Sequence, residues 1–275
     1  MVAVEGETLR RSLDRAEGQG PMHVVNAWAS AHELVLAQFK VDAKTHEITA
    51  LPEWLRLLDL AGAVVTSDAM GCQVESARQI QAQGADDVLS LKENQPGLYR
   101  DGDDLFTWLR SSHPLDQPVA FGHAEQVDGG HGRIETRRVW STEALAGVVS
   151  GARWAGRTSL VMVESIRQLG AEESVERRYS LSSLPGATDE DAQRLNRVIR
   201  TPGEIENRVL WGVDVAMGED VNRTRRGERA QHLALIRKRD VHLWRQAHSV
   251  TVGIAAKQKR AGWDHDYWLK MLSPT

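Results

Sequence analysis

The stretch AGAVVTSDAMGCQVESARQIQAQGADDVLSLK, residues 61–92, decides the fold class of this 275-residue chain. Its first seven residues are an apolar run typical of a buried strand, and the run stops at Asp68. Residues 72–83 repeat apolar side chains at helical spacing, Gly84 is a natural helix stop, and residues 87–91 are a second strand-like run. This order predicts two strands of one sheet joined by a crossover helix.

The residues upstream of this stretch predict further strands and a helix. The alternating valines of residues 1–5 favour a short strand that leads to a turn at Gly6. Residues 23–29 and 34–41 are rich in Val, Leu and aromatic residues, and the short polar break between them is typical of a hairpin. Residues 47–60 show helical spacing, with Pro52 tolerated in the first turn. Three antiparallel strands extended by two crossover strands, with helices on the faces, give the mixed α/β sheet of the ribonuclease H-like layout.

The sequence pattern changes after residue 102. Apart from a short helix expected over residues 105–109, it predicts strands joined by Gly-rich turns. Two hairpins are expected. Their strands are residues 120–127 with 133–140, and 159–169 with 174–184. Helical spacing returns over residues 190–199 and again from residue 204. We therefore expect a first part of the core over 1–101, a β-rich insertion over 102–186 and C-terminal helices with a basic tail over 187–275.

Composition and charge narrow the class of protein. Hydrophobic residues at 41% and charged residues at 26% are ordinary for a globular domain. The chain contains neither an apolar run of membrane-spanning length nor a signal peptide, so we expect a cytoplasmic protein with no membrane partner. Cys72 is the only cysteine, which excludes an internal disulfide and favours a buried neutral thiol. The net charge is -4, yet residues 221–275 hold twelve Lys or Arg against four Asp or Glu, a balance that permits DNA binding.

Two carboxylates stand where a metal site could form. Asp68 follows a hydrophobic strand, and Glu5 belongs to a strand expected beside it, so one cation could bridge the two. Paired divalent ions about 3.5–4 Å apart activate the attacking oxygen and stabilise the leaving oxygen in phosphoryl transfer. Hard oxygen ligands suit Mg²⁺ or Mn²⁺. The pattern alone equally fits an Asp that caps a turn or a helix.

Seven stretches of sequence favour the metal-site interpretation of Asp68, because together they resemble one protein family. They are VTSDAMGCQ (65–73), LKENQPGLY (91–99), HGRIETRR (131–138), VESIRQ (163–168), IEN (205–207), GVDVAMGED (212–220) and KRAGWDHDYWLKML (259–272). They are similar, in the same order, to motifs of the ISAs-one or H-repeat transposases, which are DDE-type enzymes of bacterial insertion sequences. The resemblance covers nearly the whole chain.

The resemblance implies a ribonuclease H-like catalytic domain with a β-rich insertion before the last catalytic helix. It places the three catalytic, metal-binding carboxylates on Glu5, Asp68 and Glu206, which would hold two Mg²⁺ or Mn²⁺ ions. In the family a water attacks the phosphate at the element's end, and the freed 3′-hydroxyl attacks target DNA. The partner implied is double-stranded DNA, with a homodimer expected in the DNA complex.

Nine further residues are candidate DNA contacts on the resemblance or on their charge and aromatic character. They are Lys92, Asn94, Gln95, His131, Arg133, Trp211, Arg223, Arg225 and Arg226. Each also has a simpler interpretation as a solvated loop, a hairpin tip, a buried aromatic or an exposed helix face.

The chain departs from the family pattern at the first carboxylate. The family usually reads Asp-Gly-Lys, whereas this chain has Glu5, Gly6 and Glu7. A metal-bound oxygen displaced by about 1 Å can cost roughly 100-fold in rate, so Glu5 bears directly on activity. Glu7 replaces a base by an acid, and we expect it to repel phosphate.

Further departures surround the third carboxylate and the start of the chain. Pro202 and Leu210 stand where the family has histidines, and residues 201–204 fit a capping box from which a helix could restart and still present Glu206. The family has an additional segment ahead of its first carboxylate, so the resemblance implies a truncated, partly degenerate copy. Three functions follow: an active transposase, an inactive DNA-binding remnant, or a host nuclease of the same fold.

Overall fold

The computed structural model describes residues 1–13, 18, 20–32, 34–41, 44–111, 119–130, 132–146, 148, 154, 156–205, 211–247 and 250–272. The chain divides into two compact units. Unit 1 contains residues 1–2 and 48–200, and unit 2 contains residues 3–47 and 201–275. Among the helices of the described residues, none combines the length and the apolar character needed to cross a membrane.

Unit 1 contains a parallel pair of strands joined by a helix, as the stretch 61–92 predicts. Strands β4 (Val64–Ser67) and β5 (Asp86–Leu91) pair in parallel, and α2 (Val74–Ala82) connects them. The first strand starts later than predicted, because Gly62 forms a turn with a φ of 70° and its N–H donates to the carbonyl of Gly84. Glycine is favoured at that φ because it lacks the Cβ that would clash.

The strand-rich segment of unit 1 forms four antiparallel strands in a meander. They are β6 (Phe121–Gly130), β7 (Arg133–Thr142), β8 (Ser159–Leu169) and β9 (Glu172–Ser182). The two predicted hairpins are confirmed. The last strand also pairs antiparallel with β5, so the strand order in this unit is β4-β5-β9-β8-β7-β6. The predicted β-rich segment therefore extends the same sheet.

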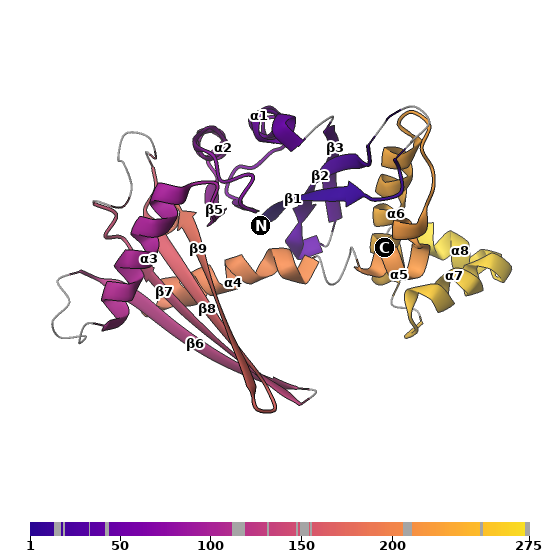
Figure 1. Ribbon diagram of the computed structural model, residues 1–275. Helices are drawn as coiled ribbons and strands as arrows, with labels where there is room; N and C mark the ends of the chain where they lie inside the picture. Colours follow the sequence, from indigo (N-terminus) through magenta and orange to yellow (C-terminus); the bar gives the residue numbers. More distant parts are fainter. Residues whose placement is uncertain are drawn as a thin grey trace. The chain divides into compact units, whose positions relative to one another are not determined.

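Two helices of unit 1 cover opposite faces of these strands (Figure 1). The helix α3 (Pro96–Ser111) is much longer than the short helix expected over residues 105–109, and its Phe106 lies against Tyr179. On the other face α4 (Asp189–Ile205) packs Leu195 and Val198 into a buried cluster with valines of β7 and β8. Burial of this apolar surface fixes which face of each strand is inward.

Unit 2 combines three strands with C-terminal helices. Strands β1 (Val2–Leu9), β2 (Met22–Ala29) and β3 (Leu34–Val41) lie in the order β3-β2-β1, and β2 pairs antiparallel with β3. A turn of 3₁₀ helix, η1 (Ser30–His32), joins β2 to β3. The helical elements are α5 (Trp211–Met217), η4 (Glu219–Val221), α6 (Arg229–Gln246), α7 (Ile254–Trp263) and α8 (His265–Leu272). The core joins Ala3 and Trp28 of the strands to Val213 and Val241 of the helices.

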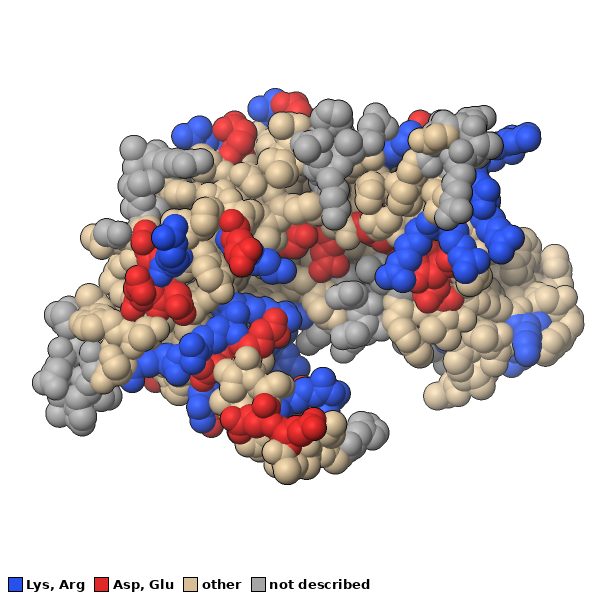
Figure 2. Space-filling model, viewed as in Figure 1, with Lys and Arg blue, Asp and Glu red and all other residues tan. Residues whose placement is uncertain are grey.

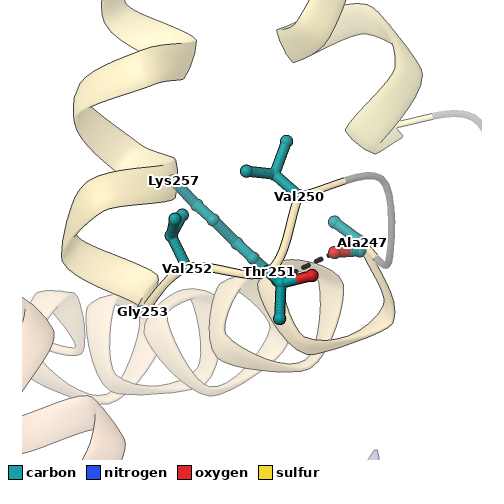
Figure 3. A pocket seen from close by; sticks show the side chains of 6 residues that line it. All are labelled: Ala247, Val250, Thr251, Val252, Gly253 and Lys257. Carbon is teal, nitrogen blue, oxygen red and sulfur yellow. Dashed lines mark hydrogen bonds between the residues drawn. The ribbon is translucent and has the colours of Figure 1, made fainter.

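The C-terminal end of α6 is closed by a lysine from the next helix. The Nζ atom of Lys257 donates hydrogen bonds to the carbonyl oxygens of Trp244 and Ala247, both at 2.8 Å. Figure 3 shows this side chain crossing the pocket between α6 and α7, beside Val250 and Val252. A cation suits this position because the last carbonyls of a helix lack partners and carry its negative dipole end.

Three sequence predictions about element ends are wrong. The strand β1 runs through Gly6 to Leu9 instead of turning at the glycine, because a sheet can accept glycine in a strand interior. The helix α1 (Lys44–Leu55) begins earlier and ends three residues after Pro52, which lies in its interior and lacks an N–H for the helical ladder. The helix α4 continues through Pro202 to Ile205 without the restart predicted at residues 201–204, since its packed apolar face holds it in place.

Candidate functional site

Asp68 stands directly after the C-terminal end of β4, exposed to solvent. Its Oδ1 atom accepts hydrogen bonds from the backbone N–H groups of Met70, at 3.1 Å, and Gly71, at 3.3 Å. Among the described residues, no donor contacts the second oxygen, Oδ2. The turn-capping interpretation of this residue therefore holds for one oxygen, while the other remains available to a ligand.

The turn that follows Asp68 depends on a glycine. A Cβ on Gly71 would lie 1.8 Å from the Oγ atom of Ser67, so only glycine lets the chain fold back onto the end of β4. The next residue, Cys72, is buried as predicted, and burial together with the charge of Asp87 raises the pKa of its thiol to about 12. This thiol is neutral at physiological pH, so it contributes packing and no nucleophile.

The loop after β5 is tied to the Asp68 turn by its amide side chains. The Nδ2 atom of Asn94 donates to the carbonyl of Ala69 at 2.6 Å, and the Nε2 atom of Gln95 donates to the carbonyl of Cys72 at 3.3 Å. Parallel pairing of β4 with β5 puts the carboxyl ends of both strands at one edge, which is why these loops meet. Lys92 is exposed at the start of the same loop.

Glu5 lies in unit 2, in the middle of β1, and is half-buried. Its neighbours at the alternate positions of the strand face the helices: Ala3 packs against Val213 and Val241, and Glu7 contacts Lys238. Because alternate residues of a strand share a face, the Glu5 side chain points to this helical side as well.

Glu7 does not act as a free acidic group, which corrects the expectation that it repels phosphate. Its carboxylate accepts a hydrogen bond from the fully buried Lys238 of α6 and another from Nδ2 of Asn26 at 3.0 Å. The Nζ atom of Lys238 also donates to Asn26 at 3.1 Å and to Gln38 at 3.0 Å, so all three ammonium protons have acceptors. The charge of Glu7 is thus balanced inside the unit.

A second acid, Glu219 of η4, borders this ion pair. Burial, followed by the negative charge of Glu7, raises the pKa of Glu219 to about 7, against the opposing charges of Lys238 and Arg237. The Arg237 guanidinium lies 4.0 Å from the Glu219 carboxylate. A carboxyl with this pKa holds its proton through part of the range below neutrality.

The third carboxylate predicted from the sequence, Glu206, lies outside the described residues, just beyond the last residue of α4. In the described part of the chain, no group of three His, Cys, Asp or Glu side chains is close enough to hold a metal ion. Asp68 presents a carboxylate oxygen without a hydrogen-bond donor among the described residues, and such an oxygen is the kind of hard ligand that a divalent cation prefers.

The candidate DNA contacts occupy several surfaces. In unit 2, Trp211 is 65% exposed at the start of α5, and the three arginines before α6, Arg223, Arg225 and Arg226, are exposed. Figure 2 shows Lys and Arg side chains grouped over the part of unit 2 that holds α6. In unit 1, Arg133 begins β7 and pairs with Glu135 at 3.2 Å, while His131 lies outside the described residues.

Sequence reasoning missed the buried Glu7–Lys238 pair and the half-buried Arg137 on one face of β7. A lysine inside the otherwise amphipathic helix α6 gives no local sign of burial, because its partner is 231 residues away. Arg137 did leave a signal, since HGRIETRR alternates along a strand and divides its bases between two faces.

Residues 3–239 of the chain match the family described as the transposase DDE domain, and the chain belongs to that family. The family prediction made from the motifs is thereby confirmed. The matched range contains all three residues at which the catalytic carboxylates are expected.

Individual relatives agree with this assignment. The chain is 31% identical to the "H repeat-associated putative transposase YhhI" of Escherichia coli K12, over 99% of this chain and 71% of the relative. It is 34% identical to the "Putative transposase YncI" of Escherichia coli O157:H7, over 99% of this chain and 69% of the relative. A solved piggyBac transposase synaptic complex with hairpin DNA matches with a TM-score of 0.47 and 10% identity, covering 100% of this chain and 54% of that chain.

Proposed function

We propose that this transposase domain cleaves and joins DNA strands in a metal-dependent reaction carried by Glu5, Asp68 and Glu206. The observation that supports this most is the state of Asp68, whose Oδ1 is fixed by two backbone N–H groups while Oδ2 faces solvent. Such anchoring orients a carboxylate before a ligand arrives, which lowers the entropy lost on binding. The ribonuclease H-like fold is part of the proposal.

The three carboxylates would hold two Mg²⁺ or Mn²⁺ ions, which supply activation of a nucleophilic oxygen and stabilisation of a leaving oxygen. Around them the chain's own residues have separate tasks. Lys92, exposed at the same edge as Asp68, would attract a DNA phosphate. Asn94 and Gln95 would act mainly by holding the two loops together, because their amide groups are engaged with the carbonyls of Ala69 and Cys72.

DNA would also contact surfaces away from the carboxylates. Arg223, Arg225 and Arg226 are suited to phosphate contacts, since in the described chain no carboxylate pairs with their side chains. The exposed Trp211 ring could stack on a base. Arg133, at the start of β7, and His131 are further proposed contacts. Double-stranded DNA from the element's ends and the target is the proposed substrate, bound by a homodimer.

The test compares Asp68→Asn with Asp59→Asn in a nicking assay on a supercoiled plasmid that carries the DNA flanking the gene. Asparagine keeps the oxygen that caps the turn but removes the charge, so we expect Mg²⁺- or Mn²⁺-dependent nicking to fall by at least about 100-fold without unfolding. Asp59 is the matched control, because it is also exposed and also caps a turn, accepting the N–H of Ala61 at 3.3 Å. Its variant should keep full activity.

The two other functions give different results in the same assay. An inactive remnant, favoured by Glu5 in place of aspartate, would bind DNA in a salt-sensitive way without metal-dependent scission. Absence of nicking by the wild-type chain would overturn the proposal, and gain of nicking in Glu5→Asp would trace the loss to that residue. A host nuclease would nick equally well on plasmids without the flanking DNA, and its gene would lack terminal inverted repeats.

A further inference from the structure

Arg137 and Arg138 of β7 point to opposite faces of the β6–β9 sheet, and the arginines on the Arg138 face each contact an acid. The strand register places Glu125, Arg138, Glu164 and Arg177 in one row across the four strands. Arg138 lies 2.8 Å from Glu125 and 3.9 Å from Glu164, and Arg177 lies 2.8 Å from Glu164. Figure 2 shows blue and red side chains interleaved over these strands. Arg110 of α3 also lies 3.4 Å from Glu164, so each of these arginines has an acid in direct contact.

Arg137 points to the opposite face, which α4 covers, and is half-buried there. Its Nε atom donates to the neutral Oδ1 atom of Asn196 at 2.6 Å. Within the described residues, no carboxylate comes within ion-pair distance of its guanidinium. Among the described residues this is the only hydrogen bond of its guanidinium, so its terminal nitrogens can contact an incoming anion.

Two other arginines lie near enough to Arg137 to add to the positive charge around it. Arg200, from α4, donates to Oε1 of Gln126 at 3.0 Å and lies 3.5 Å from Asp128. Arg178, on β9, is held by Glu176 at 2.8 Å. We name Arg137, Arg178 and Arg200 the arginine cluster. Arg178 and Arg200 each have an acid in contact, whereas among the described residues Arg137 has none.

The electrostatic state of Arg137 agrees with the lack of an acid beside it. Burial, followed by the positive charges of Arg200 and Arg178, lowers the pKa of Arg137 to about 10. A guanidinium is thus kept in an unfavourable environment, whereas a structural arginine normally has an acid beside it, as Arg138 has on the other face. An anion bound to the cluster would remove the repulsion and satisfy the free nitrogens in a planar, two-point contact.

We propose that Arg137 and Arg200 bind a phosphate group of the DNA backbone on the α4 face of the β6–β9 sheet. The proposal rests on the proposed function for the identity of the ligand. The surface favours a polymer over a small phosphate, because Arg178 is 66% and Arg200 36% exposed, so an elongated backbone can reach both. Phosphate contacts of this kind fix the register of a protein on DNA without reading its sequence.

The test measures binding of the full chain to a short fluorescein-labelled duplex, in EDTA, over a series of salt concentrations. For Arg137→Gln we expect affinity to fall by about tenfold and the slope of log affinity against log salt to fall by about one unit. Arg138→Gln is the matched control, one residue away on the opposite face and already paired with two acids. Its slope should equal that of the wild type.

Thermal unfolding separates binding from a structural role. Arg137→Gln removes a repelled charge, so this variant should be at least as stable as the wild type. Arg200→Gln, on the surface of α4, is a second variant, and we expect the same fall in the slope of log affinity against log salt. An unchanged slope in both variants would overturn the site. A different outcome is that inorganic phosphate raises the melting temperature of the wild type while the variants keep the DNA affinity of the wild type. That pair of results would point to a small-anion site and overturn the assignment to DNA. Metal-dependent nicking is scored separately, so a chain that binds through Arg137 but cannot nick refutes the proposed function alone.

Discussion

Replacement of Glu7 by lysine would place two ammonium groups where the structure has one buried ion pair. Lys238 is 0% exposed and Glu7 only 17%, so solvent screens this pair weakly. The variant is informative because lysine is the residue that the family usually has at this position. If Glu7 were merely a decayed DNA contact, lysine should improve binding at no cost to the fold.

The structure predicts the opposite, because Lys238 would lose its carboxylate partner. Removal of one member of a buried ion pair costs about 3–5 kcal/mol, chiefly from the charge left without a partner. The new ammonium adds repulsion of up to about 4 kcal/mol at contact distance. Relaxation of the long side chains reduces this sum, so we expect Glu7→Lys to lower the free energy of unfolding by at least about 3 kcal/mol. That is a large part of a typical total of about 5–15 kcal/mol.

Urea unfolding followed by circular dichroism measures this loss. The charge-reversed double variant, Glu7→Lys with Lys238→Glu, should recover most of the stability, because the pair is restored with opposite polarity. Glu75→Lys is the control on an exposed ion pair, with Glu75 3.4 Å from Arg78, and it should change stability by less than about 1 kcal/mol. A Glu7→Lys chain as stable as the wild type would refute the reasoning, and a simultaneous gain in DNA affinity would restore the interpretation of Glu7 as a lost contact.

Two further predictions concern the acid near this pair and the turn at Asp68. The pKa of Glu219 is raised from 4.5 to about 7, so the folded chain holds a proton that the unfolded chain has released between those values. Stability should therefore fall as pH rises through this window, by up to about 3 kcal/mol, and Glu219→Gln should remove that part of the slope in urea unfolding at a series of pH values. Gly71→Ala should lower stability by about 1–3 kcal/mol and reduce nicking, because its Cβ would collide with Ser67. Gly97→Ala is the control, because Gly97 lies in α3 with open space where its Cβ would be. It should leave nicking unchanged and stability unchanged or slightly higher, and equal effects of the two alanines would contradict the steric argument.

The local pattern of the sequence predicted most of the elements in the described chain. Apolar alternation and helical spacing identified the parallel pair β4 and β5, the helix between them and both hairpins of the insertion. The pattern failed at element ends. Gly6 and Pro202 have strong local preferences for a turn and a helix boundary, yet β1 and α4 pass through them because packing of their neighbours outweighs those preferences.

What the sequence by itself determined is the family, the order of elements and the positions at which the catalytic carboxylates are expected, since each of these depends on motifs within a few residues. Only the tertiary structure decided which charges are paired. Glu7 and Lys238 are distant in sequence but joined in the core, while Arg137 and Arg138 are adjacent and differ completely in their partners. The physical reason is that a strand sends successive side chains to opposite faces, so the environment of each charge depends on the elements that pack there.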